Sequence, residues 1–192
     1  AGGRHLQFLS VLADVTKAPR WIALRDKLIT LWLASPDWDP TYGTYFVGAY
    51  STDPAFCCSA SGVGVPNAYA KGYRANSSWS LADLIEGFMA AYEATGNPIL
   101  RDRALRIAQH IYTYAGGTNG FVASVFGVDT TTGLHVDKYA AYGLTTYTDP
   151  NYTISVINTQ VLAYQLTGET TYLDRAKEWL FLGTRGTFGS NV

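Results

Sequence analysis

The clearest pattern of apolar and polar positions lies in the middle of the chain, between residues 76 and 114. Apolar residues recur there at i, i+3, i+4, i+7 and i+11: Leu81, Leu84, Ile85, Phe88 and Tyr92. This is the spacing of one buried helical face. The run ends at Gly96, which can close a helix, and Pro98, which can begin the next one. A second apolar helical pattern over residues 99–112 completes a predicted antiparallel αα-hairpin.

The same pattern returns 72 residues further along the chain. Residues 91–96 (AYEATG) recur as residues 163–168 (AYQLTG), and the triplet Asp-Arg-Ala at 102–104 recurs at 174–176. A weaker copy opens the chain, where Thr16 and Lys17 precede Pro19 and another helical pattern. An internal repeat of this kind predicts the architecture directly. We expect an all-α fold of three αα-hairpins, at about residues 5–34, 79–115 and 152–183, within one domain over residues 1–192.

Two long segments, residues 35–78 and 116–151, separate the predicted hairpins. Loops of this length in a compact domain usually carry function. A short strand is expected near residues 45–50, and a small β-hairpin is expected from the alternation at 121–126 and 134–137 around residues 130–133. Because turns within hairpins are short and connections between hairpins are long, both long segments should lie at one end of the bundle, on one face.

The second helix of the first hairpin is apolar nearly all round. Its apolar residues are Trp21, Ile22, Leu24, Leu28, Ile29, Leu31, Trp32 and Leu33. A helix with this pattern is normally covered on more than one side. We therefore expect it to be buried on more than one side.

Composition excludes several classes of partner. The net charge is −1 and charged residues make up only 15% of the chain, which gives no electrostatic basis for binding nucleic acid or an anionic membrane. No apolar run approaches the ~20 residues that cross a bilayer. The two cysteines, Cys57 and Cys58, are adjacent and have no nearby histidine, so no metal site and no cofactor is expected. Scarce cysteine and lysine with abundant Tyr, Thr, Gly and Asn favour an extracellular or periplasmic location.

Aromatic residues are in excess, at 14% of the chain, and many lie in or beside the long segments. Such rings offer flat apolar faces with a polar edge, the kind of surface that stacks on sugar rings. The candidates for binding a sugar are Trp38, Tyr42, Tyr45, Tyr73, Trp79 and Tyr142. The alternative is that these rings only hold the loops against the helices.

The repeated turn Thr95-Gly96 followed by Asp102-Arg103-Ala104, and its copy at residues 167–176, resembles the helical hairpins of α/α-toroid carbohydrate-active proteins. That superfamily includes glycoside hydrolases, polysaccharide lyases and sugar epimerases. The resemblance covers all three hairpins but lies in packing positions, so it implies a fold more than a reaction. It implies inner helices beginning near Leu6, Leu81 and Ile154, and an oligo- or polysaccharide as the partner. A complete toroid has about six hairpins, so this chain would be part of a longer protein, a smaller open array, or a subunit whose ends pack on other copies.

On inner helices, polar residues of the first turns would face the cavity. These are His5 and Gln7, Asp83 and Glu86, and Ser155 and Asn158. Glu86, with Asn158 at the same repeat position, is the candidate general acid, and Asp83 and Asn158 are candidate substrate-binding residues. Asp37 or Asp39 would supply the second carboxylate of a glycoside hydrolase. The alternatives are a solvated Glu86 and ordinary turn chemistry at residues 37–40.

A second cluster, His135 with Tyr139, carries the residue types that serve as the acid–base pair of polysaccharide lyases. The long segments hold six aspartates and only three basic residues, and an acidic rim repels a polyanionic substrate. A neutral glycan and a hydrolase are therefore favoured over a lyase. A third hypothesis is a non-catalytic subunit that assembles head to tail through its open repeat ends.

Overall fold

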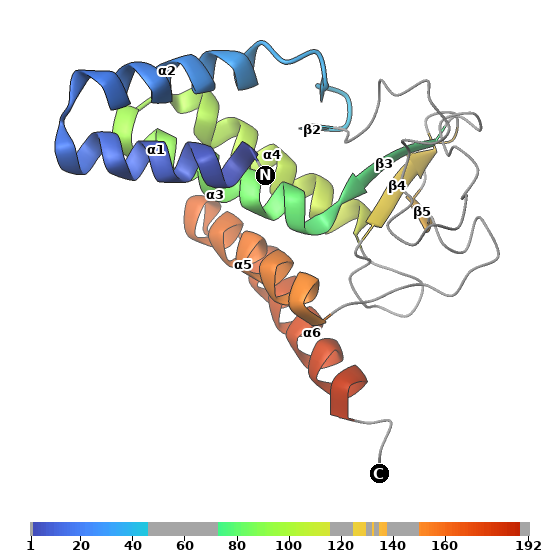
Figure 1. The fold of residues 1–192 in the computed structure, drawn as a ribbon. Coiled ribbons are helices and arrows are strands. Elements are labelled where there is room, and N and C mark those ends of the chain that lie inside the picture. Colours follow the sequence, from blue (N-terminus) through green and yellow to red (C-terminus); the bar gives the residue numbers. More distant parts are fainter. Residues whose placement is uncertain are drawn as a thin grey trace, which may run out of the picture.

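The computed structural model describes residues 2–45, 73–115, 125–129, 132, 135–137 and 150–188. These ranges contain the helices α1 (Gly2–Thr16), α2 (Pro19–Leu33), α3 (Ser78–Thr95), α4 (Pro98–Tyr114), α5 (Pro150–Thr167) and α6 (Thr170–Phe188). Consecutive helices pair as α1–α2, α3–α4 and α5–α6 (Figure 1). The prediction of a mostly helical fold with six packed helices is confirmed.

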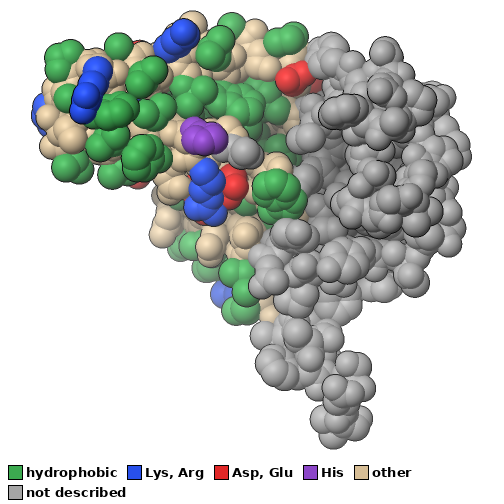
Figure 2. Space-filling model, viewed as in Figure 1, with side chains coloured by type: hydrophobic (Ala, Val, Ile, Leu, Met, Phe, Trp, Pro, Cys, Tyr) green, Lys and Arg blue, Asp and Glu red, His purple; other side chains and the backbone are tan. Residues whose placement is uncertain are grey.

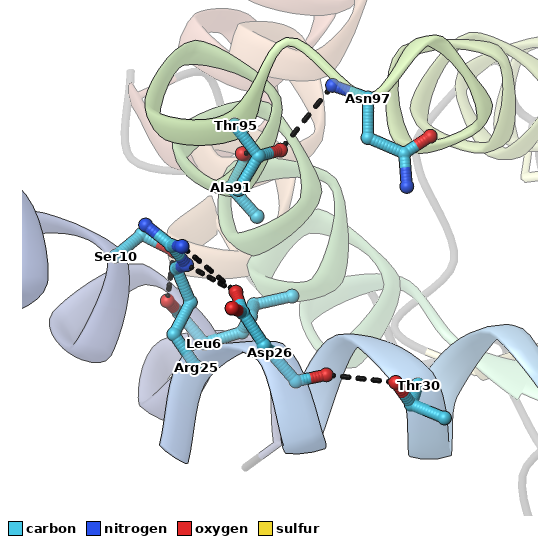
Figure 3. A network of polar contacts seen from close by, with 8 residues as sticks. All are labelled: Leu6, Ser10, Arg25, Asp26, Thr30, Ala91, Thr95 and Asn97. Atoms are coloured by element: carbon cyan, nitrogen blue, oxygen red, sulfur yellow. Dashed lines mark hydrogen bonds and ion pairs between the residues drawn. The ribbon is translucent and has the colours of Figure 1, made fainter. Parts of the chain in front are cut away.

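The short turns inside the three hairpins share one construction. Each has a threonine followed by a residue of positive φ: Thr16-Lys17 (52°), Thr95-Gly96 (69°) and Thr167-Gly168 (77°). Each threonine hydroxyl donates to the carbonyl four residues earlier, at 2.7, 2.7 and 2.8 Å. The amide two residues later donates back to the same hydroxyl, as Figure 3 shows for Thr95 and Asn97. The turn of the weak first copy therefore has the same geometry as the other two.

Helix α3 is the centre of the described core. It packs against α1 on one side, against α5 on another, and against its own hairpin partner α4. The α1–α3 crossing is close, because a Cβ on Gly87 would lie 2.4 Å from the carbonyl oxygen of Gly3. Fully buried side chains such as Leu6, Phe88 and Ile111 fill the space between these helices. The odd-numbered helices thus form a row, and each carries its even-numbered partner.

Two small antiparallel sheets lie at the opposite end of the hairpins from the short turns (Figure 1). Strands β1 (Trp38–Asp39) and β2 (Thr44–Tyr45) form the first sheet. The second has the order β3-β4-β5, with β3 (Tyr73–Ser77) running directly into α3. The predicted hairpin is confirmed as β4 (Val125–Asp129) and β5 (His135–Asp137). Its first strand extends to residue 129, past the predicted end at 126, because β3 pairs along the whole of β4.

Two expectations need correction. Strand β3 was not predicted, since Tyr73–Ser77 has no alternating apolar pattern and forms through pairing with the distant β4. Helix α2 was expected to be buried on more than one side, but its only buried residues are Arg25 and Ile29. Leu24 and Leu31 are exposed, because α2 packs chiefly on α1 and has more apolar surface than α1 can cover. Residues 46–50 of the other predicted strand lie outside the described ranges.

Candidate functional site

The sequence prediction centred on Glu86 places the first candidate site on one stripe of α3. Trp79, Asp83 and Glu86 are spaced i, i+4 and i+7, so their side chains leave the helix on the same side. Trp79 begins this stripe in the first turn of α3 and is exposed. The indole therefore stands at the loop end of the bundle, and the two carboxylates follow along the helix.

Arg4 of α1 joins both carboxylates. Its Nε lies 2.8 Å from Asp83 Oδ1 and its Nη1 lies 2.9 Å from Glu86 Oε2. The close Gly3–Gly87 crossing brings the two helices near enough for this contact. The side chain of Glu86 is 31% exposed and that of Asp83 is 15% exposed. Figure 2 shows basic and acidic side chains and a histidine side by side on this face of the molecule.

The chemistry of this cluster is that of a hydrogen-bonding surface with a net charge of −1. One guanidinium engages one oxygen of each carboxylate. Gln7 and Asn158 occupy the repeat positions of Glu86 in the neighbouring helices α1 and α5. Gln7 accepts a long hydrogen bond of 3.4 Å from Arg4, and Asn158 is exposed. A row of polar groups thus follows the three odd-numbered helices.

Asp37 and Asp39 do not join this cluster. Asp39 Oδ1 accepts from the amides of Thr41 and Tyr42, at 2.8 and 3.3 Å, which is the hydrogen-bonding pattern of an Asx turn. Asp37 makes its contacts with Ser35, just after the end of α2. The turn chemistry raised as an alternative for residues 37–40 is the role that the geometry displays.

The first long segment packs on a different side of α3. Phe88 lies 6.0 Å from the Tyr45 ring, and Phe88 is two residues after Glu86, about 200° around the helix. Glu86 therefore points to α1, and Phe88 points to the segment that carries the aspartates. The contact described for Glu86 is with Arg4 of α1, and the hydrogen bonds described for Asp37 and Asp39 are with residues 35, 41 and 42.

Trp38 and Tyr45 hold this segment against α4. The Tyr45 hydroxyl donates to the Trp32 carbonyl at 2.8 Å and accepts from Arg103. Burial is the main cause that raises the Tyr45 pKa to about 12. The Arg103 guanidinium lies 4.0 Å from the centroid of the Trp38 ring. These two rings are thus engaged by the protein itself, as the alternative interpretation of the aromatic residues proposed.

A polar cavity of about 220 Å³ lies between this segment and the outer side of α4. Tyr42, Arg106, Gln109, His110, Thr113 and Tyr114 are among its lining residues. The Nδ1 atom of His110 is 3.0 Å from the Tyr42 carbonyl oxygen. Burial lowers the pKa of His110 to about 4, so the ring is neutral at pH 7. The Tyr42 prediction therefore leads to this cavity, and Glu86 is not among its lining residues.

Tyr73, His135, Tyr139 and Tyr142 are the remaining predicted site residues, and the structure describes only the backbone of the first two. Tyr73 pairs through its backbone with Asp129, and His135 pairs through its backbone with Val128. The side chains of Tyr73 and His135 lie outside the described part of the structure. Tyr139 and Tyr142 lie outside it altogether. The histidine–tyrosine pair of the lyase hypothesis stays a prediction.

Sequence reasoning missed three residues that organise the two regions. Arg103 carried a signal, because it belongs to the repeated Asp-Arg-Ala triplet. His110 also carried one, since it lies in the apolar stripe of α4 beside Ile107 and Ile111 and is buried like them. Arg4 carried none, because its partners are about 80 residues away and only the packing of α1 on α3 brings them together.

No group of three His, Cys, Asp or Glu residues arranged for a metal ion is found among the residues described above. In the described part of the chain, no helix combines the length and the apolar content that a bilayer crossing demands. Comparison of the sequence with models of known protein families and with curated proteins finds no match. The site must therefore be interpreted from its geometry.

Proposed function

We propose that this protein binds a neutral glycan along the face formed by α1, α3 and α5, and hydrolyses it. The observation that carries the proposal is the stripe of Trp79, Asp83 and Glu86 on α3. It combines an exposed indole, which can stack on a sugar ring, with two carboxylates within one helical turn. The packing of three hairpins in a row supports the α/α-toroid resemblance from which the substrate class comes.

Asp83 replaces Asp37 and Asp39 as the second carboxylate in this proposal. Side chains at i and i+3 on a helix start about 5–6 Å apart, and the carboxyl groups of retaining glycosidases lie about 5–5.5 Å apart. Glu86, the more exposed of the two, is assigned as the acid that protonates the glycosidic oxygen. Asp83, the more buried, is assigned as the nucleophile. The expected outcome is hydrolysis with retention of anomeric configuration.

Arg4 has a positioning role in this scheme. Its guanidinium holds both carboxylates on the same side of α3. The contact of Nη1 with Glu86 favours the carboxylate that remains once the acid has donated its proton, and the contact of Nε with Asp83 orients the nucleophile. The net charge of −1 for this group of three supports a neutral rather than an anionic glycan.

The test is turnover of neutral oligosaccharides by Glu86→Gln and Asp83→Asn. Each change keeps the shape of the side chain and removes its acid or nucleophile, so turnover should fall by ~10²-fold or more. Glu93→Gln is the matched control, because Glu93 lies about two further turns along α3 and is exposed. Unchanged turnover in both site variants, with folding verified by circular dichroism, would rule out the assignment of the carboxylates.

The same assay separates the hydrolase from the lyase alternative. A lyase leaves an unsaturated sugar that absorbs in the near ultraviolet, and a hydrolase does not. An absorbing product that disappears in His135→Ala or Tyr139→Phe, and persists in Glu86→Gln, would favour the second cluster. Binding is measured independently by titrating Trp79→Ala with the same sugars, and affinity should fall by about tenfold for the loss of one stacking ring.

A further inference from the structure

Most of the large exposed apolar side chains of the described residues lie on the two outermost hairpins, and the middle hairpin carries Trp79 and Ile99. Five belong to what we call the front flank, on α1 and α2: Phe8, Val11, Val15, Leu24 and Leu31. Two belong to the rear flank, on α5 and α6: Ile154 and Leu180. Large exposed apolar patches usually mark interaction surfaces. Comparison of the three repeats indicates which partner these two flanks fit.

Each front-flank position has an equivalent in the second and third hairpins, at offsets of 79 and then 72 residues. Phe8 corresponds to Gly87 and Thr159, both of which are buried. Gly87 is the residue that contacts Gly3 of the preceding hairpin. Phe8 itself is 63% exposed. The front flank is therefore the surface that, in hairpins two and three, packs against the hairpin before it.

Leu31 repeats this relation on the even-numbered helices. Its equivalent in α4 is His110, which is buried against the segment that follows hairpin one, with Nδ1 3.0 Å from the Tyr42 carbonyl oxygen. Leu24 corresponds to Arg103, which reaches back to the Leu33 carbonyl of hairpin one at 3.2 Å. The front flank has leucines where the later hairpins have residues that contact a preceding hairpin.

The rear flank shows the converse relation. Ile154 corresponds to Gly3 and Ala82, which are both buried. Leu180 is 54% exposed, whereas its equivalents Ile29 and Ala108 are 7% and 2% exposed. The Ala108 carbonyl accepts from Gln160 of the following hairpin at 3.0 Å. The rear flank is therefore the surface that, in hairpins one and two, packs against the hairpin after it.

We propose that the front flank of one copy of this chain packs on the rear flank of a second copy, head to tail. One chain carries both halves of this heterologous contact, so the contact continues the order α1–α3–α5 from copy to copy. Phe8 and Ile154 stand where the internal interface has the small residues Gly87 and Gly3. The helices of two copies therefore lie further apart than α1 and α3, with side chains instead of backbone in contact.

The test is light scattering after size-exclusion chromatography, on the full chain and on Phe8→Glu and Leu180→Glu. The molar mass of the native chain should rise with concentration. Each variant alone should stay monomeric, because a charge on either flank opposes desolvation of the contact. Both side chains are exposed, so melting temperatures should remain near that of the native chain.

Mixing the two variants gives the decisive result. Phe8→Glu keeps an intact rear flank and Leu180→Glu keeps an intact front flank, so an equimolar mixture should form dimers and nothing larger. Ile99→Glu is the matched control and should assemble like the native chain, because Ile99 and its equivalents Arg20 and Thr171 are all exposed.

Three outcomes would overturn the proposal. The native chain could remain monomeric at every concentration, the single variants could still assemble, or their mixture could remain monomeric. Glu86→Gln should assemble like the native chain, so a failure of this proposal is distinguishable from a failure of the proposed glycan hydrolysis.

Discussion

The two ends of the helix bundle are built on different principles. At the short-turn end, three turns repeat one local design, in which a threonine hydroxyl bonds within its own turn and the next residue is left-handed. At the loop end, each connection is individual, and the first long segment is held by side chains from α4. Arg103, Arg106 and His110 bind carbonyl groups that are 66 to 70 residues away in the chain.

This difference separates what a repeat specifies from what it leaves open. A local turn is specified by a short stretch of sequence, because all its hydrogen-bonding partners lie within six residues of one another. A connection held by distant side chains can vary in each repeat without changing the helices. The cavity beside Tyr42 and His110 lies where the three repeats differ, which is the usual relation between a scaffold and its functional loops.

The largest loss of stability is expected at the loop end, for Arg103→Ala. The change removes hydrogen bonds to Tyr45 and Leu33 and the stacking on Trp38. The free energy of unfolding should fall by roughly 3 to 4 kcal/mol. Urea denaturation measures it.

The repeat-equivalent Arg175→Ala is the matched control. Arg175 stacks on Tyr112 and pairs with Glu178 on the same helix, and these contacts within the described residues involve no carbonyl of a distant segment. Arg175→Ala should lower the free energy of unfolding by about 1 kcal/mol. Equal losses in the two variants would contradict the view that Arg103 holds the long segment.

A pH dependence of stability should arise from His110. The unfolded ring binds a proton near pH 6.5, whereas burial lowers the folded pKa to about 4. Between these values the unfolded state binds more protons, so stability is fully present above pH 6.5 and decreases as the pH falls toward 4. The loss from this group is on the order of 3 kcal/mol at ~1.4 kcal/mol per pKa unit.

His110→Gln removes the titration and keeps a side-chain amide that can donate to the Tyr42 carbonyl. Its unfolding free energy should therefore depend less on pH between 7 and 4 than that of the native chain. Parallel pH profiles for the two proteins would show that the buried ring does not titrate in this way.

The helices were predictable from the sequence because their signals are local. Gly96, Pro98 and the apolar spacing of α3 lie within a few residues of the structure that they specify. The turn at Lys17 was predictable only through the repeat, since lysine itself gives no sign of a left-handed residue. Strand β3 was not predictable, because its pairing partner β4 is about 50 residues away.

The candidate site was predictable only in part, for the same reason. The sequence placed Asp83 and Glu86 on one side of an inner helix, and in the structure both contact Arg4. The pairing of Glu86 with Asp37 or Asp39 required a tertiary contact that no local pattern reports. The structure instead supplies Arg4 from α1 as the partner of Glu86.

At the short-turn end, Thr95→Val should have a smaller effect. Valine keeps the shape of threonine but loses the hydroxyl that donates to the Ala91 carbonyl and accepts from the Asn97 amide. The amide can turn to water, so the expected loss is about 1 kcal/mol. Thermal melting would reveal it. A similar loss in Thr16→Val and Thr167→Val would show that the three turns are energetically as well as geometrically equivalent.

The smallest effect is expected for Lys17→Gly, and it is stabilising. Lys17 is the one described non-glycine residue with positive φ, and it stands where the other two turns have Gly96 and Gly168. A side chain in the left-handed region costs ~1–2 kcal/mol, and glycine gives back part of this through its larger unfolded-state entropy. The loss of the ion pair between Lys17 and Asp14 matters little, because both side chains are exposed. A net gain of about 0.5 kcal/mol should remain.

The reciprocal change, Gly96→Lys, isolates the backbone term. A Cβ at Gly96 meets no atom within 4 Å, so any loss of stability comes from its φ of 69° and not from a clash. Stability should fall by about 1 kcal/mol. If Lys17→Gly destabilises while Gly96→Lys is neutral, the first turn depends on its lysine side chain, and the structural equivalence of the three turns does not extend to their energetics.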